Sequence, residues 1–342
     1  LAFAEQKSDT PLVEPLVQHW LKSLAKRNQW QTFLTYYESL VNAGEIATTK
    51  DLDCHYGFAL YKNGLIEKAF NQAQKLWLVG FSQPKTCDPI FKLWRGSDRV
   101  TRELAWGRLA LSLKENNKKL SNYLLRFIHK EDKTLANNYR LVHIKPRTIK
   151  RYKSFRQNSS KNREIILHGA TRLARTDPKT AFTALRHYES ILTFKPDVLE
   201  KAYANIGIRL ANRSANDMLK DQLPVNLRNY PNLVEARIRQ SLKGDDFSTA
   251  LVLISLLPDE IRDTSRWQYW KARILGRSED IADRKRAREI FRELAIERSF
   301  YGFLAADVIG KPYNFEEEIT PVTQAQTISI EEMPGIQRAL EL

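Results

Sequence analysis

Residues 52–80 read LDCHYGFALYKNGLIEKAFNQAQKLWLVG, and this stretch decides the fold. Apolar and small residues recur every three or four positions on both sides of Asn63-Gly64, which places them on one face of each of two helices. Asn-Gly is a turn signal, and Gly80 stands where helices commonly end. The predicted faces consist of Leu52, Tyr56, Ala59 and Leu60, and of Ile66, Ala69, Phe70, Ala73, Leu76 and Trp77. The stretch therefore predicts a helical hairpin.

A second hairpin is predicted towards the N-terminus. Thr10-Pro11 suits the start of a helix, and Gly44 suits the end of the next one. The apolar residues of the first helix recur every four positions, and those of the second every three or four. They are Leu12, Leu16, Trp20 and Leu24, followed by Trp30, Phe33, Leu34, Tyr37 and Val41.

Small residues around the Asn63-Gly64 turn, with aromatic residues beside them, resemble the tetratricopeptide helix-turn-helix unit. Similar half-patterns occur within 242–253 and 272–291, at irregular spacing. We therefore predict an all-α fold, a right-handed superhelix or solenoid of degenerate tetratricopeptide-like hairpins, each packing its apolar stripe on its neighbours. The stretch 116–196 is the most basic and the least periodic, so it carries no predicted boundaries.

The character of the chain changes after Gly310-Lys311-Pro312. We expect an α-superhelical scaffold domain over 1–311 and an acidic segment over 312–342 that leads into a linker-helix domain. Within that segment, the pattern predicts a largely extended linker over 312–333 and the first turns of a helix over 334–342.

Positive charge is concentrated upstream of that segment. The chain carries 55 Lys and Arg against 40 Asp and Glu, and residues 1–311 hold 54 and 34 of these, a net charge of +20. Such a surplus favours an acidic partner, namely nucleic acid, anionic lipid or a polyanionic cell-wall polymer, with a solvated basic surface as the alternative. No apolar run reaches the roughly 20 residues of a bilayer-spanning helix, which argues against a membrane protein.

The usual signatures of catalytic chemistry are absent from the sequence. It contains no GxxxxGK[ST], GxGxxG, HExxH or GxSxG motif, and its six histidines show no ligand spacing, so we expect no cofactor and no metal. Asp245-Asp246 is better explained by helix capping than by acid–base catalysis. Arg95, Arg99 and Arg102 are interpreted as a wet helix face.

One aromatic cluster has two interpretations. Arg266, Trp267, Trp270 and Arg273 combine rings and cations that could stack on sugars, and they are our candidate glycan-binding residues. Because Trp267, Trp270 and Ile274 share a helix face, packing in the core is the favoured alternative.

The two cysteines, Cys54 and Cys87, are 33 positions apart and form no metal-binding pattern. In a cytosolic protein they would be unrelated buried thiols, whereas in an exported protein they would form a disulfide. Composition alone leaves both alternatives open.

Several blocks of sequence resemble the soluble lytic murein transglycosylase family. They are Leu76 to Pro84, Cys87 to Trp94, Trp267 to Arg273 and Ser299 to Ala306. The similarity is to the noncatalytic α-superhelical region of that family and the start of its linker domain. It implies a ring or horseshoe, a periplasmic location, and a disulfide between Cys54 and Cys87, because these positions match a bridged pair of the family.

The family's enzymes cleave peptidoglycan between N-acetylmuramic acid and N-acetylglucosamine and leave a 1,6-anhydro product. Their catalytic glutamate precedes a serine in a lysozyme-like domain that also contains a Gly-Leu-Met-Gln stretch. This sequence has Glu38-Ser39 and Glu189-Ser190 but no Gly-Leu-Met-Gln, so we reject both glutamates as catalytic and expect the chain to be inactive alone.

We therefore expect a scaffold that positions glycan strands and a catalytic domain. The expected partners are peptidoglycan strands, the catalytic domain and other cell-wall enzymes; nucleic acid is disfavoured. The alternatives are a tetratricopeptide-like basic adaptor for protein or nucleic acid, and a stand-alone regulator of full-length transglycosylases.

Overall fold

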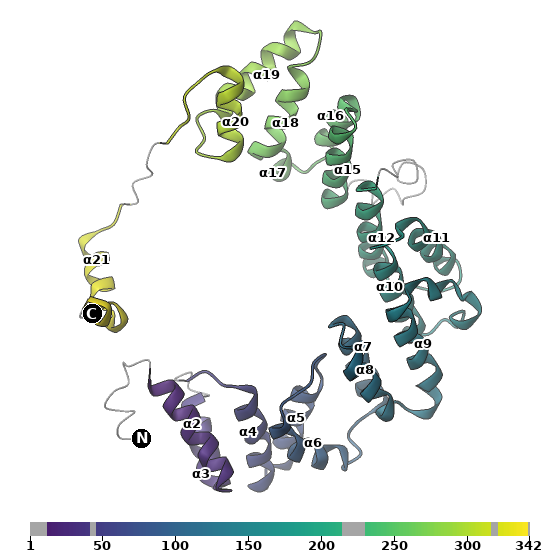
Figure 1. Ribbon diagram of the computed structural model, residues 1–342, viewed down its shortest axis with the longest axis vertical. Coiled ribbons are helices and arrows are strands. Elements are labelled where there is room, and N and C mark those ends of the chain that lie inside the picture. The colour runs from purple at the N-terminus through teal and green to yellow at the C-terminus, as the bar shows by residue number, and fades with distance from the viewer. Residues whose placement is uncertain (1–11, 42–45, 214–229, 316–320, 341–342) are drawn as a thin grey trace. The chain divides into compact units, whose positions relative to one another are not determined.

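The computed structural model describes residues 12–41, 46–213, 230–315 and 321–340 (Figure 1). Within these ranges the chain consists of α-helices, short 3-10 helices, turns and irregular segments, and none of the ranges contains a β-strand. The predicted all-α fold is confirmed. The described residues form two compact units: unit 1 holds those up to Arg140 and from Pro321 onward, and unit 2 holds those from Leu141 to Phe315.

Unit 1 is a succession of helices in which neighbours in sequence pack on each other. Contacts join α2 to α3, α3 to α4, α4 to α5, α5 to α6, and α7 to α8. The helices are α2 (Val13–Lys26), α3 (Trp30–Val41), α4 (Lys50–Lys62), α5 (Ile66–Trp77), α6 (Asp88–Arg95), α7 (Arg102–Lys114) and α8 (Lys118–Leu124), and later α21 (Gln324–Glu331) and α22 (Pro334–Leu340). The helix α9 (Lys133–Ile144) contains the boundary with unit 2.

Unit 2 repeats this organisation. Its helices are α10 (Ser160–Leu173), α11 (Pro178–Glu189), α12 (Pro196–Ala211), α15 (Pro231–Lys243), α16 (Phe247–Ser255), α17 (Asp259–Arg262), α18 (Ser265–Leu275), α19 (Ile281–Leu294) and α20 (Phe300–Ile309). Contacts run from α10 through α11 and α12 to α15 and α16, and from α16 through α18 and α19 to α20. Each unit is thus a stack of helical hairpins, as predicted.

In the described ranges, four hairpins share one turn geometry, with a single residue in the left-handed backbone conformation between the helices. These residues are Asn28, Gly64, Asn116 and Asp245, with φ of 58°, 79°, 55° and 56°. Glycine, asparagine and aspartate tolerate this conformation best, which explains why only these types occur there. Asp246 then caps α16 by accepting a hydrogen bond from the Thr249 amide at 3.1 Å, so the predicted capping role is confirmed.

The apolar face predicted for α2 is wrong in part. Leu12 and Leu16 are 71% and 46% exposed, and the helix instead buries Val17, Leu21, Leu24 and Ala25. Four residues turn an α-helix by about 400°, so a strict four-residue spacing drifts about 40° per step around the axis. The three-and-four spacing of the actual face stays on one side. Thr10-Pro11 and Gly44 lie outside the described residues.

The extended linker predicted over 312–333 is also corrected, because α21 occupies Gln324–Glu331. A capping box starts this helix: the Thr323 hydroxyl accepts from the Gln326 amide, and the Gln326 side chain accepts from the Thr323 amide. The helix predicted after residue 333 is present as α22. The predicted domain boundary after residue 311, the superhelix handedness and the ring or horseshoe stay predictions.

Candidate functional site

A disulfide joins Cys54 in α4 to Cys87, the residue before α6, with the two Cα atoms 4.7 Å apart. Both side chains are fully buried. Beside the bridge, the Thr86 hydroxyl donates to the Asp51 carboxylate at 2.7 Å. The pairing implied by the family resemblance is confirmed, and it holds the start of α6 against α4.

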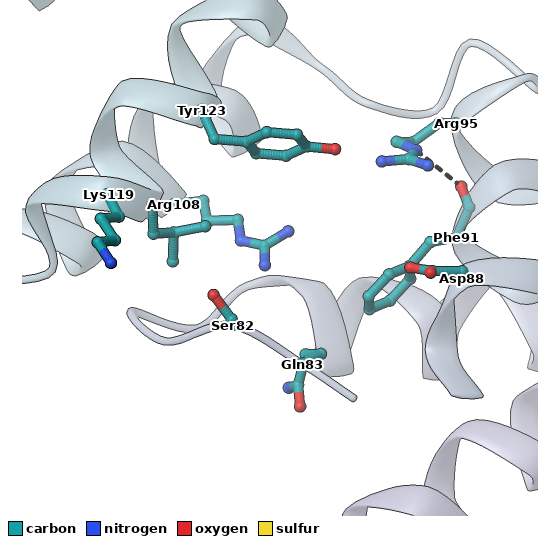
Figure 2. A pocket seen from close by; sticks show the side chains of 9 residues that line it. Ser82, Gln83, Asp88, Phe91, Arg95, Arg108, Lys119 and Tyr123 are labelled. Carbon is teal, nitrogen blue, oxygen red and sulfur yellow. Dashed lines mark hydrogen bonds between the residues drawn. The ribbon is translucent and has the colours of Figure 1, made fainter. Parts of the chain in front are cut away.

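A small cavity of about 340 Å³ lies next to this disulfide, and its lining includes Asp88, the residue that follows Cys87 (Figure 2). Asp88, Phe91 and Arg95 face it from α6, since residues three and four apart share a helix face. Lys119 and Tyr123 are four apart on α8 and face it for the same reason. The complete lining is Ser82, Gln83, Asp88, Phe91, Arg95, Arg108, Lys119, Leu120 and Tyr123.

Arg108 is the buried cation of this cavity. It lies in the middle of α7, is 5% exposed, and extends into the space between Tyr123 and Ser82 (Figure 2). Its guanidinium carbon lies 4.5 Å from the centre of the Trp77 ring, a cation–π distance. Its Nε–H is buried and has no hydrogen-bond acceptor among the described residues.

Burial lowers the pKa of Arg108 to about 10, with the positive charge of Arg95 acting in the same direction and Tyr123 opposing it. The side chain is therefore still charged at neutral pH. Uncompensated burial of a charge is unfavourable, so this cation is held at a cost in stability.

Aromatic rings pack against the two arginines of the cavity, Arg95 and Arg108. Trp77 packs edge-on against Trp94 and Phe127, with ring centres 5.3 and 6.1 Å apart. Arg95 lies over Phe127 at 5.4 Å, and its Nε donates to the Phe91 carbonyl at 3.1 Å. Phe127 thus holds the Arg95 guanidinium, and Trp77 holds that of Arg108.

Gly80 brings α5 and α7 close enough for these contacts. A Cβ atom at this position would lie 2.6 Å from the Leu111 carbonyl oxygen and 2.5 Å from Cγ of Glu115, both in sterically forbidden range. The chain that leaves α5 therefore passes directly against α7 only because residue 80 is glycine. This approach sets Trp77 beside Arg108.

The polar groups of the cavity suit an anion that also carries an N–H donor. Three cations, Arg95, Arg108 and Lys119, face one carboxylate, Asp88, in the lining. Gln83 donates its Nε2 to the Leu76 carbonyl at 2.6 Å, and its buried Oε1 has no donor in the described part of the chain.

Sequence reasoning missed Arg108 and Lys119. The available signal was Arg108 itself, which is the one charged residue in the ten-residue run Leu104–Leu113. A lone charge in an otherwise apolar helix indicates a buried ionic group. The interpretation of Arg95, Arg99 and Arg102 as one helix face is wrong, because Arg99 lies between α6 and α7.

The four candidate glycan-binding residues of α18 differ in how far the structure buries them. Trp267 is 1% exposed in the core of unit 2, and its Nε1 donates to Glu235 at 3.1 Å, so its ring does not face solvent. The core interpretation is confirmed for Trp267. Trp270 is partly buried, whereas Arg266 and Arg273 are exposed. These three are spaced four and three apart and share one stripe of α18.

The strongest concentration of positive charge lies in unit 2. Between Lys145 and Arg175 the sequence holds ten Lys and Arg and a single acid, Glu164. Six of the cations are exposed on two short 3-10 segments and their flanks, here called the basic segment: Lys145, Arg147, Lys150, Arg151, Lys153 and Arg156. Asp177 pairs with one of them, Arg147, at 2.7 Å.

No group of three or more His, Cys, Asp and Glu in the described ranges is placed to hold a metal ion. The nearest approach of two histidines joins His143 Nδ1 to His168 Nε2 at 3.0 Å. Glu38 accepts from the Tyr56 hydroxyl at 3.1 Å, and Glu189 from the Tyr203 hydroxyl at 2.6 Å. Both glutamates thus serve helix packing.

Comparison with known proteins shows which proteins this chain is similar to. No protein-family model matches the chain. Soluble lytic murein transglycosylases of Escherichia coli K12 and Salmonella typhimurium are 25% and 24% identical to it over 345 residues. Each match covers 99% of this chain and 51% of the relative, so the chain spans about half the length of the curated relatives it matches. The chain is a relative of the soluble lytic murein transglycosylases.

Solved structures agree with this relationship to soluble lytic murein transglycosylases. An inactive mutant of a lytic transglycosylase from Pseudomonas aeruginosa matches 99% of this chain and 54% of its own, with a TM-score of 0.72 and 30% identity. The 70 kDa soluble lytic transglycosylase of Escherichia coli matches with a TM-score of 0.75 at 23% identity, over 100% of this chain and 54% of that one. The resemblance stated from the sequence is confirmed. In the described ranges, none of the helices has the length and apolarity needed to cross a bilayer.

Proposed function

We propose that this chain is the noncatalytic superhelical part of a soluble lytic murein transglycosylase and that it holds peptidoglycan glycan strands for cleavage by a catalytic domain. The observation that carries this proposal is the match of 99% of the chain to about half of each transglycosylase relative. The sequence also lacks the Gly-Leu-Met-Gln stretch that accompanies the catalytic glutamate of the family.

Charge supplies the physical reason for strand binding. Peptides attached to glycan strands carry carboxylates, and the exposed cations of the basic segment would attract them. In the same unit, Arg266, Trp270 and Arg273 offer a ring between two cations, which suits stacking on a sugar. The expected location is the periplasm, where peptidoglycan and its cleavage enzymes meet.

The test is cosedimentation of the chain with purified peptidoglycan over a salt series. Charge-driven binding weakens from 0.1 M to 1 M salt, because the screening length falls from about 10 Å to about 3 Å. Binding that does not change with salt, or no binding, would contradict the proposal. No 1,6-anhydro product is expected from the chain alone.

Two variants of equal charge change locate the binding surface. Lys150, Arg151, Lys153 and Arg156 changed together to glutamine should weaken binding roughly tenfold, since each exposed charge contributes up to about 1 kcal/mol. The control changes Lys26, Lys68, Lys75 and Lys114, which are exposed in unit 1, to glutamine and should retain binding. Equal loss in both variants would indicate a nonspecific effect of net charge.

The same assay separates the alternatives. Preference for nucleic acid or for a protein partner over peptidoglycan would favour a basic adaptor. A change in the activity of a full-length transglycosylase on adding the chain would favour a regulator.

A further inference from the structure

The cavity between α6, α7 and α8 holds a buried cation, Arg108, whose Nε–H is unsatisfied in the described part of the chain. Arg108 is 5% exposed, and its Nε–H has no hydrogen-bond acceptor in the described ranges. The contrast with Arg102 in the same helix is informative, because Arg102 pairs with both Asp132 and Glu131. Arg102 is thus neutralised by two acids, whereas the Nε–H of Arg108 has no acceptor in the described part of the chain.

The shape of the cation selects a planar anion. The guanidinium carbon of Arg108 lies over the Trp77 ring at 4.5 Å, and its Nε–H is buried without an acceptor in the described part of the chain. A guanidinium edge presents two parallel N–H donors that match the two oxygens of a carboxylate. Lys119 and Arg95 add positive charge around the same space.

The second unsatisfied group restricts the ligand further. Gln83 Oε1 is buried without a donor, since the Nε2 of the same side chain is already bound to the Leu76 carbonyl. A simple carboxylate or an inorganic anion has no N–H to offer it, whereas a peptide has an amide next to its terminal carboxylate. The Phe91 and Leu120 side chains give the cavity apolar walls for a small side chain.

We propose that this cavity binds the terminal carboxylate of a short peptide, with Arg108 holding the carboxylate and Gln83 accepting from the adjacent peptide N–H. Its volume of about 340 Å³ lies at the small end of ligand pockets and suits the last one or two residues of a chain. The biological source rests on the proposed function: peptides attached to glycan strands end in such carboxylates.

Binding is tested by NMR titration of the intact chain with N-acetyl-alanyl-alanine, following its tryptophan indole N–H resonances. A Trp77→Phe variant assigns the resonance of the ring beside Arg108. The free acid should shift that resonance, and the C-terminal amide of the same peptide should bind at least roughly tenfold more weakly, because it lacks the charge that Arg108 pairs. Acetate alone should also bind more weakly, since it offers no N–H to Gln83. Equal binding of acid and amide would overturn the proposal.

Substitutions of cavity residues test whether the peptide binds in this cavity. Arg108→Met should abolish the preference for the acid, and Arg108→Lys should weaken it, because an ammonium group lacks the two parallel donors. Arg95→Gln with Lys119→Gln changes only the rim and should weaken acid binding severalfold without unfolding the chain. Lys92→Gln, on the exposed side of α6, is the matched control and should bind like the parent. Retention of full acid binding in both the Arg108 and the rim variants would refute the site.

The failure of this proposal and that of the proposed function are distinguishable. Peptide binding without peptidoglycan cosedimentation would retain the carboxylate site and reject the glycan-holding role. Salt-sensitive cosedimentation without preference for the free acid would retain the glycan-holding role and reject the carboxylate site.

Discussion

The guanidinium of Arg108 lies over the Trp77 ring, 4.5 Å from its centre, although the two residues are in different helices and 31 positions apart in sequence. Trp77 ends α5 and Arg108 occupies the middle of α7. The pair therefore links α5 to α7 through a cation whose Nε–H has no acceptor in the described residues.

The first prediction concerns the stability cost of that charge. Arg108→Met keeps the length and apolar stem of the side chain but removes the buried cation, so the free energy of unfolding should rise by about 1–2 kcal/mol, partly offset by loss of the cation–π contact. Urea denaturation at pH 7 measures the change. Arg99→Met, which removes an exposed partner of Glu67, should change stability little, because solvent screens an exposed ion pair. A large loss of stability in Arg108→Met would show that Arg108 serves the fold and not a ligand.

The second prediction uses two glycines as a matched pair. Gly80→Ala should destabilise unit 1 by about 1–3 kcal/mol, because the new methyl group would overlap the Leu111 carbonyl. Gly107→Ala, in α7, meets only Cδ1 of Leu78 at 3.6 Å and should be neutral or stabilising, since alanine favours a helix by about 1 kcal/mol over glycine. Thermal unfolding followed by circular dichroism compares them. Equal melting temperatures for the two variants would contradict the close approach at Gly80.

The third prediction concerns the bridge. Changing Cys54 and Cys87 together to alanine should lower the free energy of unfolding by about 3–4 kcal/mol, because the bridge closes a loop of 33 positions in the unfolded chain. Mass spectrometry after alkylation without reduction should find no modified cysteine in the parent. A single alkylated thiol in the folded parent would contradict the pairing.

Local periodicity predicted the hairpin of 52–80, because in its two helices three-and-four spacing, small residues and turn chemistry agree. The resemblance blocks around Trp77 and Trp94 predicted the family and the disulfide. The shared turn was missed, since Asn28, Asn116 and Asp245 carry no glycine signal and their left-handed conformation emerges only from the backbone.

The cavity could not be assembled from sequence. Its residues come from α6, α7, α8 and the loop after α5, and only tertiary packing brings Gln83 and Lys119 to one space. For Trp267 the sequence left two interpretations, because a ring beside a cation looks alike in sequence whether the ring faces solvent or the core, and the favoured core interpretation is confirmed. Burial against α15 and α16 decided between the two.

The last prediction is a pH dependence that arises in the first hairpins. His55 packs against the rings of Trp30 and Phe33, with ring centres 6.2 Å away in each case. Burial lowers the pKa of His55 below its usual range; the Asp51 carboxylate opposes this shift and Lys22 reinforces it. The folded chain therefore binds fewer protons than the unfolded chain at mildly acidic pH, and acid favours unfolding.

The stabilising contribution of neutral His55 should be complete above the unfolded pKa of about 6.5 and should be lost as the pH falls through the lower folded pKa. Urea denaturation between pH 7 and pH 5 should show a falling free energy of unfolding, and His55→Phe should reduce the slope because it retains the ring packing without the proton site. NMR titration of the His55 ring gives the folded pKa directly. A slope that His55→Phe leaves unchanged, or a His55 ring that titrates above the unfolded value, would refute the assignment.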